Sequence, residues 1–488
     1  MSELKKKTAS GFAYKFAERV GAQGISFCIQ LLLARLLMPS DYGVVALVTV
    51  FVVILDVFVI YGFGNALVAN KHSDHLDFST CFYFNFSLGL LLYAVAFFAA
   101  PLLASFYGNP LLAPLVRVMA LRIPLASVNT IQHAYVQKHM WFRKFFQATL
   151  IGTVVSGAVA VGMAYAGFGV WALVEQYLGN ALLDTVCLWF LVGWRPSREF
   201  SWARLKPIWD YGWKILVVGL IDNVYARLRS LVIGKKYSSA DLAFYSRGYV
   251  FPSFGMRLIE PTVNTVLFPA LSQCNDDRGQ MRGITKRVLQ VSTWVISPIM
   301  VGLASVGEPL VRVLLTDKWL PCVVFLQIGC IANLFRCQQF INNCVVKASG
   351  RSGLLLKLDI LKKSIGLVLI LVSMQYGVVW IAWSLVAFYF ISMVVNVAPN
   401  RKILGYGYLE QFRDVGWNIL PALLMGACIR TLGAETWSPW AVLAVRIPAG
   451  AALYLGLSLL MRNQSFFFLL KHVRSRLSGG RRKKGDAP

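Results

Sequence analysis

Long apolar segments recur along the chain and constrain its fold more than any other feature. A helix needs about 20 mainly apolar residues to cross a bilayer. Backbone groups in lipid must also be hydrogen-bonded internally, which favours helices. We predict fourteen spanning helices. The clearest segments are 42–67, 80–106, 146–166, 170–192, 366–376, 378–397, 419–432 and 440–460, and those with some polar residues are 12–36, 111–137, 209–233, 242–271, 288–315 and 323–346. The break between helices eleven and twelve is predicted at Gln375-Tyr376-Gly377.

Composition supports a membrane protein and excludes other classes. Hydrophobic residues make up 57% of the chain and charged residues 14%, whereas soluble domains are about a quarter charged. A soluble enzyme, a disordered chain and a secreted disulfide scaffold are therefore excluded. The formal net charge of +26 would suggest nucleic acid in a soluble protein. In a membrane protein it indicates cytoplasmic loops on anionic lipid and an anionic cargo.

The distribution of Lys and Arg predicts the orientation of the helices, because cytoplasmic loops are rich in both. If the lysines at 5–7 are cytoplasmic, nearly all loop cations fall on that side, and the outer loops hold Lys235, Lys236 and Lys318. We therefore predict an all-α polytopic membrane protein with both termini inside. Lys15, Glu18 and Arg19 interrupt the first apolar segment, so it is not a cleavable signal peptide. We expect the basic tail, 463–488, to lie on anionic lipid rather than nucleic acid.

Two groups of potential ligands have simple structural interpretations. Cys330, Cys337 and Cys344 recur every seven residues, which is typical of packing through small residues on one helix face. The His-Ser-Asp-His-Leu-Asp segment at 72–77 falls in a short cytoplasmic loop and is predicted to be solvated rather than metal-binding. We expect neither a metal nor a cofactor.

Polar residues repeat between the two halves of the chain. Helix one carries a stripe of Lys15, Arg19, Gln23, Ser26 and Gln30, and a shift of 199 gives Lys214, Val218, Asp222, Tyr225 and Arg229. Asn129, Gln132 and His133 likewise correspond to Gln339, Asn342 and Asn343. These matches predict two six-helix repeats, parallel because six is even, as in some transporters with a central site. The predicted parts are an N-terminal lobe 1–200, a C-terminal lobe 201–405, a helix pair 406–462 and the tail 463–488.

Ionisable residues inside the predicted helices are numerous, although each is costly unless it faces an interior or a watery cavity. Arginine suits phosphate geometry, so an excess of cations favours an anionic substrate. Arg257 and Glu260, at i,i+3, can neutralise each other. The candidate substrate-binding residues are Arg19, Arg117, Arg122, Lys214, Arg227, Arg229, Arg257 and Arg336, and the candidate ion-coupling acids are Asp56, Glu175 and Asp222. We expect Arg19, Arg122, Lys214, Arg229 and Arg336 to line a central aqueous cavity. Coupling to H+, to Na+ or to the membrane potential alone stays open.

Several motifs resemble one family of transporters. Residues 33–47, LARLLMPSDYGVVAL, resemble the helix one–two hairpin of Wzx-type oligosaccharide-lipid flippases of the MOP superfamily, in the branch with colanic acid and teichuronic acid exporters. Residues 109–115 are similar to the start of that branch's fourth helix, 267–277 to its eighth-helix exit, and 317–319 to an outer loop.

This resemblance implies transport of an undecaprenyl-pyrophosphate-linked oligosaccharide to the outer leaflet of the bacterial inner membrane. It also implies fourteen helices around a cationic cavity, and a polymerase and other glycan-assembly proteins as partners. Family cations on helices one, two, seven and eight map to Arg19, Lys214, Arg227, Arg229 and Arg257, but helix two offers Asp56 and no cation.

Two alternatives differ in class. A multidrug or ion-coupled exporter of the same superfamily would carry mainly cationic or amphipathic compounds, which the excess of arginine disfavours. A membrane glycan polymerase or ligase would need catalytic groups in its outer loops, but these are short and hold no paired carboxylates or nucleophile–base set. We therefore predict a transporter and not an enzyme.

Overall fold

The computed structural model describes residues 24–61, 63–70, 73–275, 277–433 and 437–471, and every regular element in these ranges is a helix. Arg19, His72 and the basic end of the tail lie outside the described residues. The chain divides into two compact units, 1–243 and 244–488, and each is described by itself. This division falls within one long helix, whereas the predicted lobe boundary at 200 comes from the repeat and stays a prediction.

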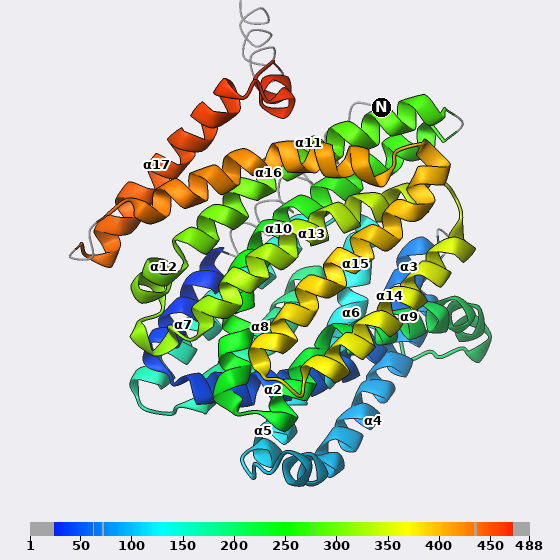
Figure 1. The fold of residues 1–488 in the computed structure, drawn as a ribbon. Coiled ribbons are helices and arrows are strands. Elements are labelled where there is room, and N and C mark those ends of the chain that lie inside the picture. The colour runs from blue at the N-terminus through cyan, green and yellow to red at the C-terminus, as the bar shows by residue number, and fades with distance from the viewer. Residues whose placement is uncertain (1–23, 62, 71–72, 276, 434–436, 472–488) are drawn as a thin grey trace, which may run out of the picture. The chain divides into compact units, whose positions relative to one another are not determined.

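The first unit is a bundle of apolar helices (Figure 1). It begins with Gly24–Leu36. The helices that follow are α2 (Pro39–Ile60), α3 (Phe63–Ala69), α4 (His75–Tyr107), α5 (Leu112–Met119), α6 (Arg122–His139), α7 (Phe142–Tyr165), α8 (Val170–Val192) and α9 (Trp202–Lys236). Helix α9 packs against α2, α3 and α4, which places it in this unit. The largest buried side chains include Leu67, Ile131 and Leu188.

The second unit contains most of α10 and all later helices. They are α10 (Ser239–Gln273), α11 (Arg278–Ser305), α12 (Gly307–Leu314), the 3-10 turn η1 (Asp317–Trp319), α13 (Cys322–Ala348), α14 (Ser352–Ser373), α15 (Val378–Leu404), α16 (Tyr408–Thr431) and α17 (Pro439–Leu460). A further helical segment spans 464–471. The core at the end of this unit joins Ala422, Met425 and Ile429 of α16 to Leu443 of α17.

Within the described residues, each predicted segment falls largely on one helix or on two consecutive helices, and the first half of 12–36 lies outside them. The segment 42–67 comprises α2 and α3, 111–137 comprises α5 and α6, and 288–315 comprises α11 and α12. The break between helices eleven and twelve is confirmed, since α14 ends at Ser373 and α15 begins after Gly377. Gly377 has a φ of +121°, which favours glycine. Eight of the described helices are long and apolar enough to cross a membrane.

The two units contain the same order of elements and the same packed pairs. In each, a long helix leads into an eight-residue helix, α5 or α12, and then into three further helices. Helix α4 packs on α6, α6 on α8 and α7 on α8; likewise, α11 packs on α13, α13 on α15 and α14 on α15. Corresponding positions of the two units can therefore be compared directly.

Candidate functional site

In the first unit, Arg122 is held by groups from two other helices. It begins α6, and its Nη1 donates to Asp56 of α2 and to the Tyr177 hydroxyl of α8, at 2.6 Å from the latter. The Asp56 side chain is 2% exposed and that of Arg122 is 27% exposed. The carboxylate therefore lies behind a guanidinium that keeps an accessible side.

In the second unit, Arg336 of α13 is likewise paired with an acid and lies over a tyrosine ring, as Arg122 lies over the ring of Tyr177 at 4.7 Å. Its Nε lies 2.7 Å from Oε1 of Glu260 in α10, and its Nη2 donates to Oε2 at 2.9 Å. The guanidinium carbon lies 5.9 Å from the ring centroid of Tyr389 in α15. The Arg336 side chain is also 27% exposed. We call these two groups the Arg122 triad (Asp56, Arg122, Tyr177) and the Arg336 triad (Glu260, Arg336, Tyr389).

These pairs change two expectations. Glu260 pairs with Arg336, so the local Arg257–Glu260 pair is wrong. Arg122 and Arg336 both have acidic partners, so their charges do not add to an unneutralised excess. Among the described residues Arg257 is exposed and has no ion-pair or hydrogen-bond partner.

The candidate cations of α9 lie in different environments. Lys214 is exposed and has no acidic partner in the described part of the chain. Arg227 is half-buried, and its buried Nε lacks a hydrogen-bond acceptor there. Arg229 is buried. Arg117 of α5 donates from Nε to the Phe97 carbonyl at 3.4 Å and lies over that ring, so its contacts are with α4.

The three candidate coupling acids also differ. Asp56 is held by Arg122, although its buried Oδ1 has no hydrogen-bond partner in the described structure. Glu175 of α8 has a buried Oε2 that likewise lacks one, and Gly179, on the next turn, leaves room for this carboxyl group. Asp222 of α9 is exposed.

A second polar layer includes Asp184 of α8, seven residues after Tyr177. Asp184 was not among the candidate site residues. Asp184 accepts hydrogen bonds from Asn129 of α6 at 2.7 Å and from Thr149 of α7 at 3.2 Å, and lies 3.6 Å from His133. The second unit has a corresponding layer at Asn396 of α15. Its side chain donates to the carbonyl of Gln339 at 3.2 Å and accepts from Lys362 at 3.3 Å. The match of Asn129 with Gln339 was the sequence signal for this layer.

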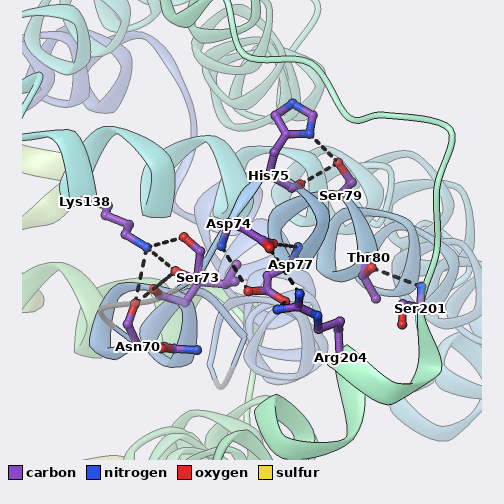
Figure 2. Close-up of polar contacts among 11 residues, drawn as sticks. Asn70, Ser73, Asp74, His75, Asp77, Ser79, Thr80, Lys138, Ser201 and Arg204 are labelled. Atoms are coloured by element: carbon purple, nitrogen blue, oxygen red, sulfur yellow. Dashed lines mark hydrogen bonds and ion pairs between the residues drawn. The ribbon is translucent and has the colours of Figure 1, made fainter.

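The polar segment at the start of α4 is tied to neighbouring helices by hydrogen bonds and ion pairs (Figure 2). Asp74 and Asp77 cap α4 reciprocally, each side chain accepting from the other's backbone N–H at 3.0 Å. Arg204 of α9 lies 3.4 Å from Asp74 and 3.6 Å from Asp77, which is buried. Lys138 of α6 donates to the Ser73 carbonyl at 2.6 Å. The bond from the Asp77 N–H, aided by Arg204, lowers the pKa of Asp74. Asp74 and His75 are exposed, as predicted, whereas the prediction of a solvated segment is wrong for the buried Asp77.

No group of three or more His, Cys, Asp and Glu side chains within the described ranges is arranged to hold a metal ion. Cys330, Cys337 and Cys344 are buried free thiols on α13. Helix α13, which carries all three, packs against α11 and α15, and buried small residues are typical of such helix packing.

The arrangement is suited to binding anions rather than to covalent chemistry. Each triad presents an oriented guanidinium with a carboxylate behind it, and arginine matches both carboxylate and phosphate in bidentate geometry. Lys214 and Arg257 add exposed cations without acidic partners among the described side chains.

Known proteins with similar sequences are named for polysaccharide biosynthesis, and one of them for transport. The family described as polysaccharide biosynthesis protein matches residues 32–324. The chain is 27% identical to the succinoglycan biosynthesis transport protein ExoT of Rhizobium meliloti, over 64% of each chain. It is 24% identical to the lipopolysaccharide biosynthesis protein WzxC of Escherichia coli, over 68% of each. It is also 24% identical to the teichuronic acid biosynthesis protein TuaB of Bacillus subtilis, over 81% of this chain and 83% of that one.

Solved structures show the same fold. The lipid II flippase MurJ, in an inward closed conformation, superposes with a TM-score of 0.74 at 14% identity, over 93% of this chain and 99% of MurJ. An inward-facing multidrug resistance MATE transporter of the MOP superfamily gives a TM-score of 0.61 at 14% identity, over 78% and 94%. The family match covers more than half of the chain. The chain is therefore a Wzx-type member of the polysaccharide biosynthesis protein family, with the MurJ and MATE fold, and a multi-pass protein of the bacterial inner membrane.

Proposed function

We propose that the protein is a flippase that moves a lipid-linked oligosaccharide, carried on undecaprenyl pyrophosphate, from the cytoplasmic to the outer leaflet. The observation that carries this proposal is the pair of partly exposed guanidinium groups, Arg122 and Arg336, inside apolar helical units. A pyrophosphate is the anionic group that such a lipid presents, and guanidinium groups bind phosphate oxygens through paired N–H donors.

The transport model comprises fourteen spans with both termini inside, two parallel six-helix repeats and alternating access. Outward movement of an anion is favoured by an inside-negative potential, by about 2.3 kcal/mol per charge at 100 mV. The potential alone is therefore an adequate energy source in this proposal. If an ion is coupled, Glu175 is the acid best suited to carry it, because its buried Oε2 has no hydrogen-bond partner among the described groups and, unlike Asp56, it is not paired with an arginine there.

The substrate-binding residues proposed are the cations of the sequence analysis, with Lys214 and Arg227 foremost among those outside the triads. Anionic phospholipids at the cytoplasmic face and glycan-assembly proteins, including a polymerase, are the proposed partners. A multidrug exporter is the second candidate, because a MATE transporter shares the fold. The positive charges of the arginines named above would repel cationic drugs, which disfavours this second candidate.

Deletion of the gene in its host, followed by analysis of lipid-linked intermediates, tests the proposal. Complete repeat units should accumulate on the cytoplasmic leaflet; incomplete units would instead indicate an assembly enzyme. Complementation with Lys214→Gln or Arg227→Gln should restore export poorly. Lys236→Gln, a cation at the exposed end of the same helix, should restore it fully. Normal export in the deletion strain, together with lost drug resistance, would favour the second candidate.

A further inference from the structure

The Arg122 triad and the Arg336 triad occupy equivalent helices of the two units. In the first unit the acid lies on α2, which the short α3 separates from the long α4, and in the second it lies on α10, directly before the long α11. The arginine lies on α6 or α13, and the tyrosine on α8 or α15. Three residue types on three corresponding helices make an accidental match improbable. The sequence comparison of the repeats did not include any of these residues.

The tyrosines occupy the same position along their helices, and the arginines agree to within one helical turn. Tyr177 and Tyr389 each lie sixteen residues before the left-handed glycine that ends the helix, Gly193 or Gly405. Arg122 lies seven residues before Asn129, and Arg336 three residues before Gln339. Both spacings place the arginine on the helix face that carries the second polar layer. The triads are therefore the same site, retained in both repeats.

Each guanidinium is only partly used by the protein. Arg122 makes both of its bonds through Nη1, so Nε and Nη2 have no hydrogen-bond acceptor among the described groups, and neither atom is a buried one. An arginine offers five N–H donors in a planar fork. Its accessible side can therefore receive a second anion, and a phosphate competes with the carboxylate for the same positive charge.

We infer that each triad is an anion-exchange site. The carboxylate of Asp56 or Glu260 pairs with the guanidinium when no cargo is bound, and a cargo phosphate replaces the carboxylate when cargo binds. This inference rests on the proposed function. An arginine without a counterion is costly inside a membrane protein, and removal of one partner from a buried pair is strongly unfavourable. The carboxylate is therefore the counterion of the arginine while the transporter, without cargo, returns to the state that loads cargo.

Binding of farnesyl pyrophosphate to the full-length protein in lipid nanodiscs tests this exchange. Asp56→Asn and Glu260→Gln remove the competing charge and keep the side-chain shape, so each should bind the probe about tenfold more tightly than the wild type. In an Arg122→Gln background, Asp56→Asn should give no gain, because the charge it releases is absent. Glu308→Gln, next to the exposed Arg312, is the control and should not change affinity.

The outcomes separate this inference from the proposed function. If the wild type binds the probe and Arg122→Gln weakens binding, but neither acid variant tightens it, the exchange is wrong and the flippase proposal stands. If the wild type does not bind the probe, the pyrophosphate proposal itself fails. Thermal unfolding of each variant is measured in parallel. Glu260→Gln keeps the test decisive if Asp56→Asn does not fold, because Glu260 is 23% exposed and depends less on burial.

Discussion

Asp184 of α8 and Asn396 of α15 occupy the same place in the two units, each nine residues before the glycine that ends its helix. Asp184 accepts from Asn129 and Thr149 and has His133 at 3.6 Å. Asn396 instead lies beside Lys362. The same layer is thus built around an anion in one unit and around a cation in the other.

Replacement of Asp184 should therefore destabilise the first unit. Asp184→Asn removes the charge near His133 and sets an amide N–H2 against donor groups, and we expect a loss of about 1–3 kcal/mol. Thermal unfolding in detergent measures it. Asp210→Asn, an exposed carboxylate on α9 without a partner among the described residues, should leave the unfolding temperature unchanged. Equal unfolding temperatures for the two variants would contradict this role of Asp184.

A close approach of two backbones makes Gly43 irreplaceable. A Cβ atom on Gly43 of α2 would lie 1.7 Å from the carbonyl oxygen of Ser239. This is a backbone atom that cannot rotate away, so Gly43→Ala must displace the start of α10 or abolish folding. We expect little or no folded protein by size-exclusion chromatography. Gly162→Ala, where no atom lies within 4 Å, should be neutral or more stable by up to about 1 kcal/mol, the helix propensity difference.

The helices were largely predictable because their signal is local. Apolar segments of spanning length identified each helix or consecutive helix pair, and Gly377 marked the break between α14 and α15. The breaks between α2 and α3, between α5 and α6 and between α11 and α12 were missed. An average of hydropathy over about 20 residues stays high across such short interruptions, so it does not reveal them.

The charge pairs were not predictable, because they join distant parts of the chain. Arg122 and Asp56 are 66 residues apart. Glu260 forms its ion pair with Arg336 on another helix and not with Arg257 on its own helix. Periodicity shows which residues share a helix face, but it does not show which faces meet. The contacts of residues 73–77 were missed for the same reason, since Arg204 and Lys138 reach this segment from α9 and α6.

The capping box of α4 predicts an acid-dependent stability. The pKa of Asp74 is lowered in the folded protein, so its contribution is present above the unfolded value, about 3.9, and is lost as pH falls through the folded value. Asparagine caps a helix about as well as aspartate, so Asp74→Asn removes the charge and keeps the cap. It should unfold at a lower temperature than the wild type at pH 7, by the amount typical of one negative charge at a helix N-terminus, about 0.3–1 kcal/mol. The difference should shrink as the pH falls below 4.

Glu199→Gln is the control for this comparison, because Glu199 is exposed in the α8–α9 loop and has no partner in the described part of the chain. Its unfolding temperature should follow that of the wild type at every pH. A difference between Asp74→Asn and the wild type that persists unchanged into strong acid would show that the Asp74 charge is not the stabilising group.

The buried phenol of Tyr406 should control stability at alkaline pH. Tyr406 lies between α15 and α16, and its hydroxyl donates to Asp414 at 2.7 Å. Asp414 also lies 3.2 Å from Lys286 of α11 and accepts from Gln290 at 3.0 Å. Burial, with the bond to Asp414, raises the pKa of Tyr406 well above its ordinary value. The folded protein therefore keeps this phenol neutral when free tyrosine, with a pKa of about 10, has ionised.

Tyr406→Phe removes the hydroxyl, leaves the ring, and should cost about 1–2 kcal/mol at pH 7, because Asp414 loses one of its donors. A raised folded pKa means that the stabilisation by the hydroxyl is complete below pH 10 and is lost as the pH rises above it. The wild type should therefore lose stability relative to Tyr406→Phe between pH 10 and 11.5, measured by thermal unfolding. Tyr376→Phe, an exposed tyrosine at the α14–α15 turn, should track the wild type. If the difference between wild type and Tyr406→Phe does not narrow in this range, the neutral Tyr406–Asp414 bond does not stabilise the α15–α16 junction.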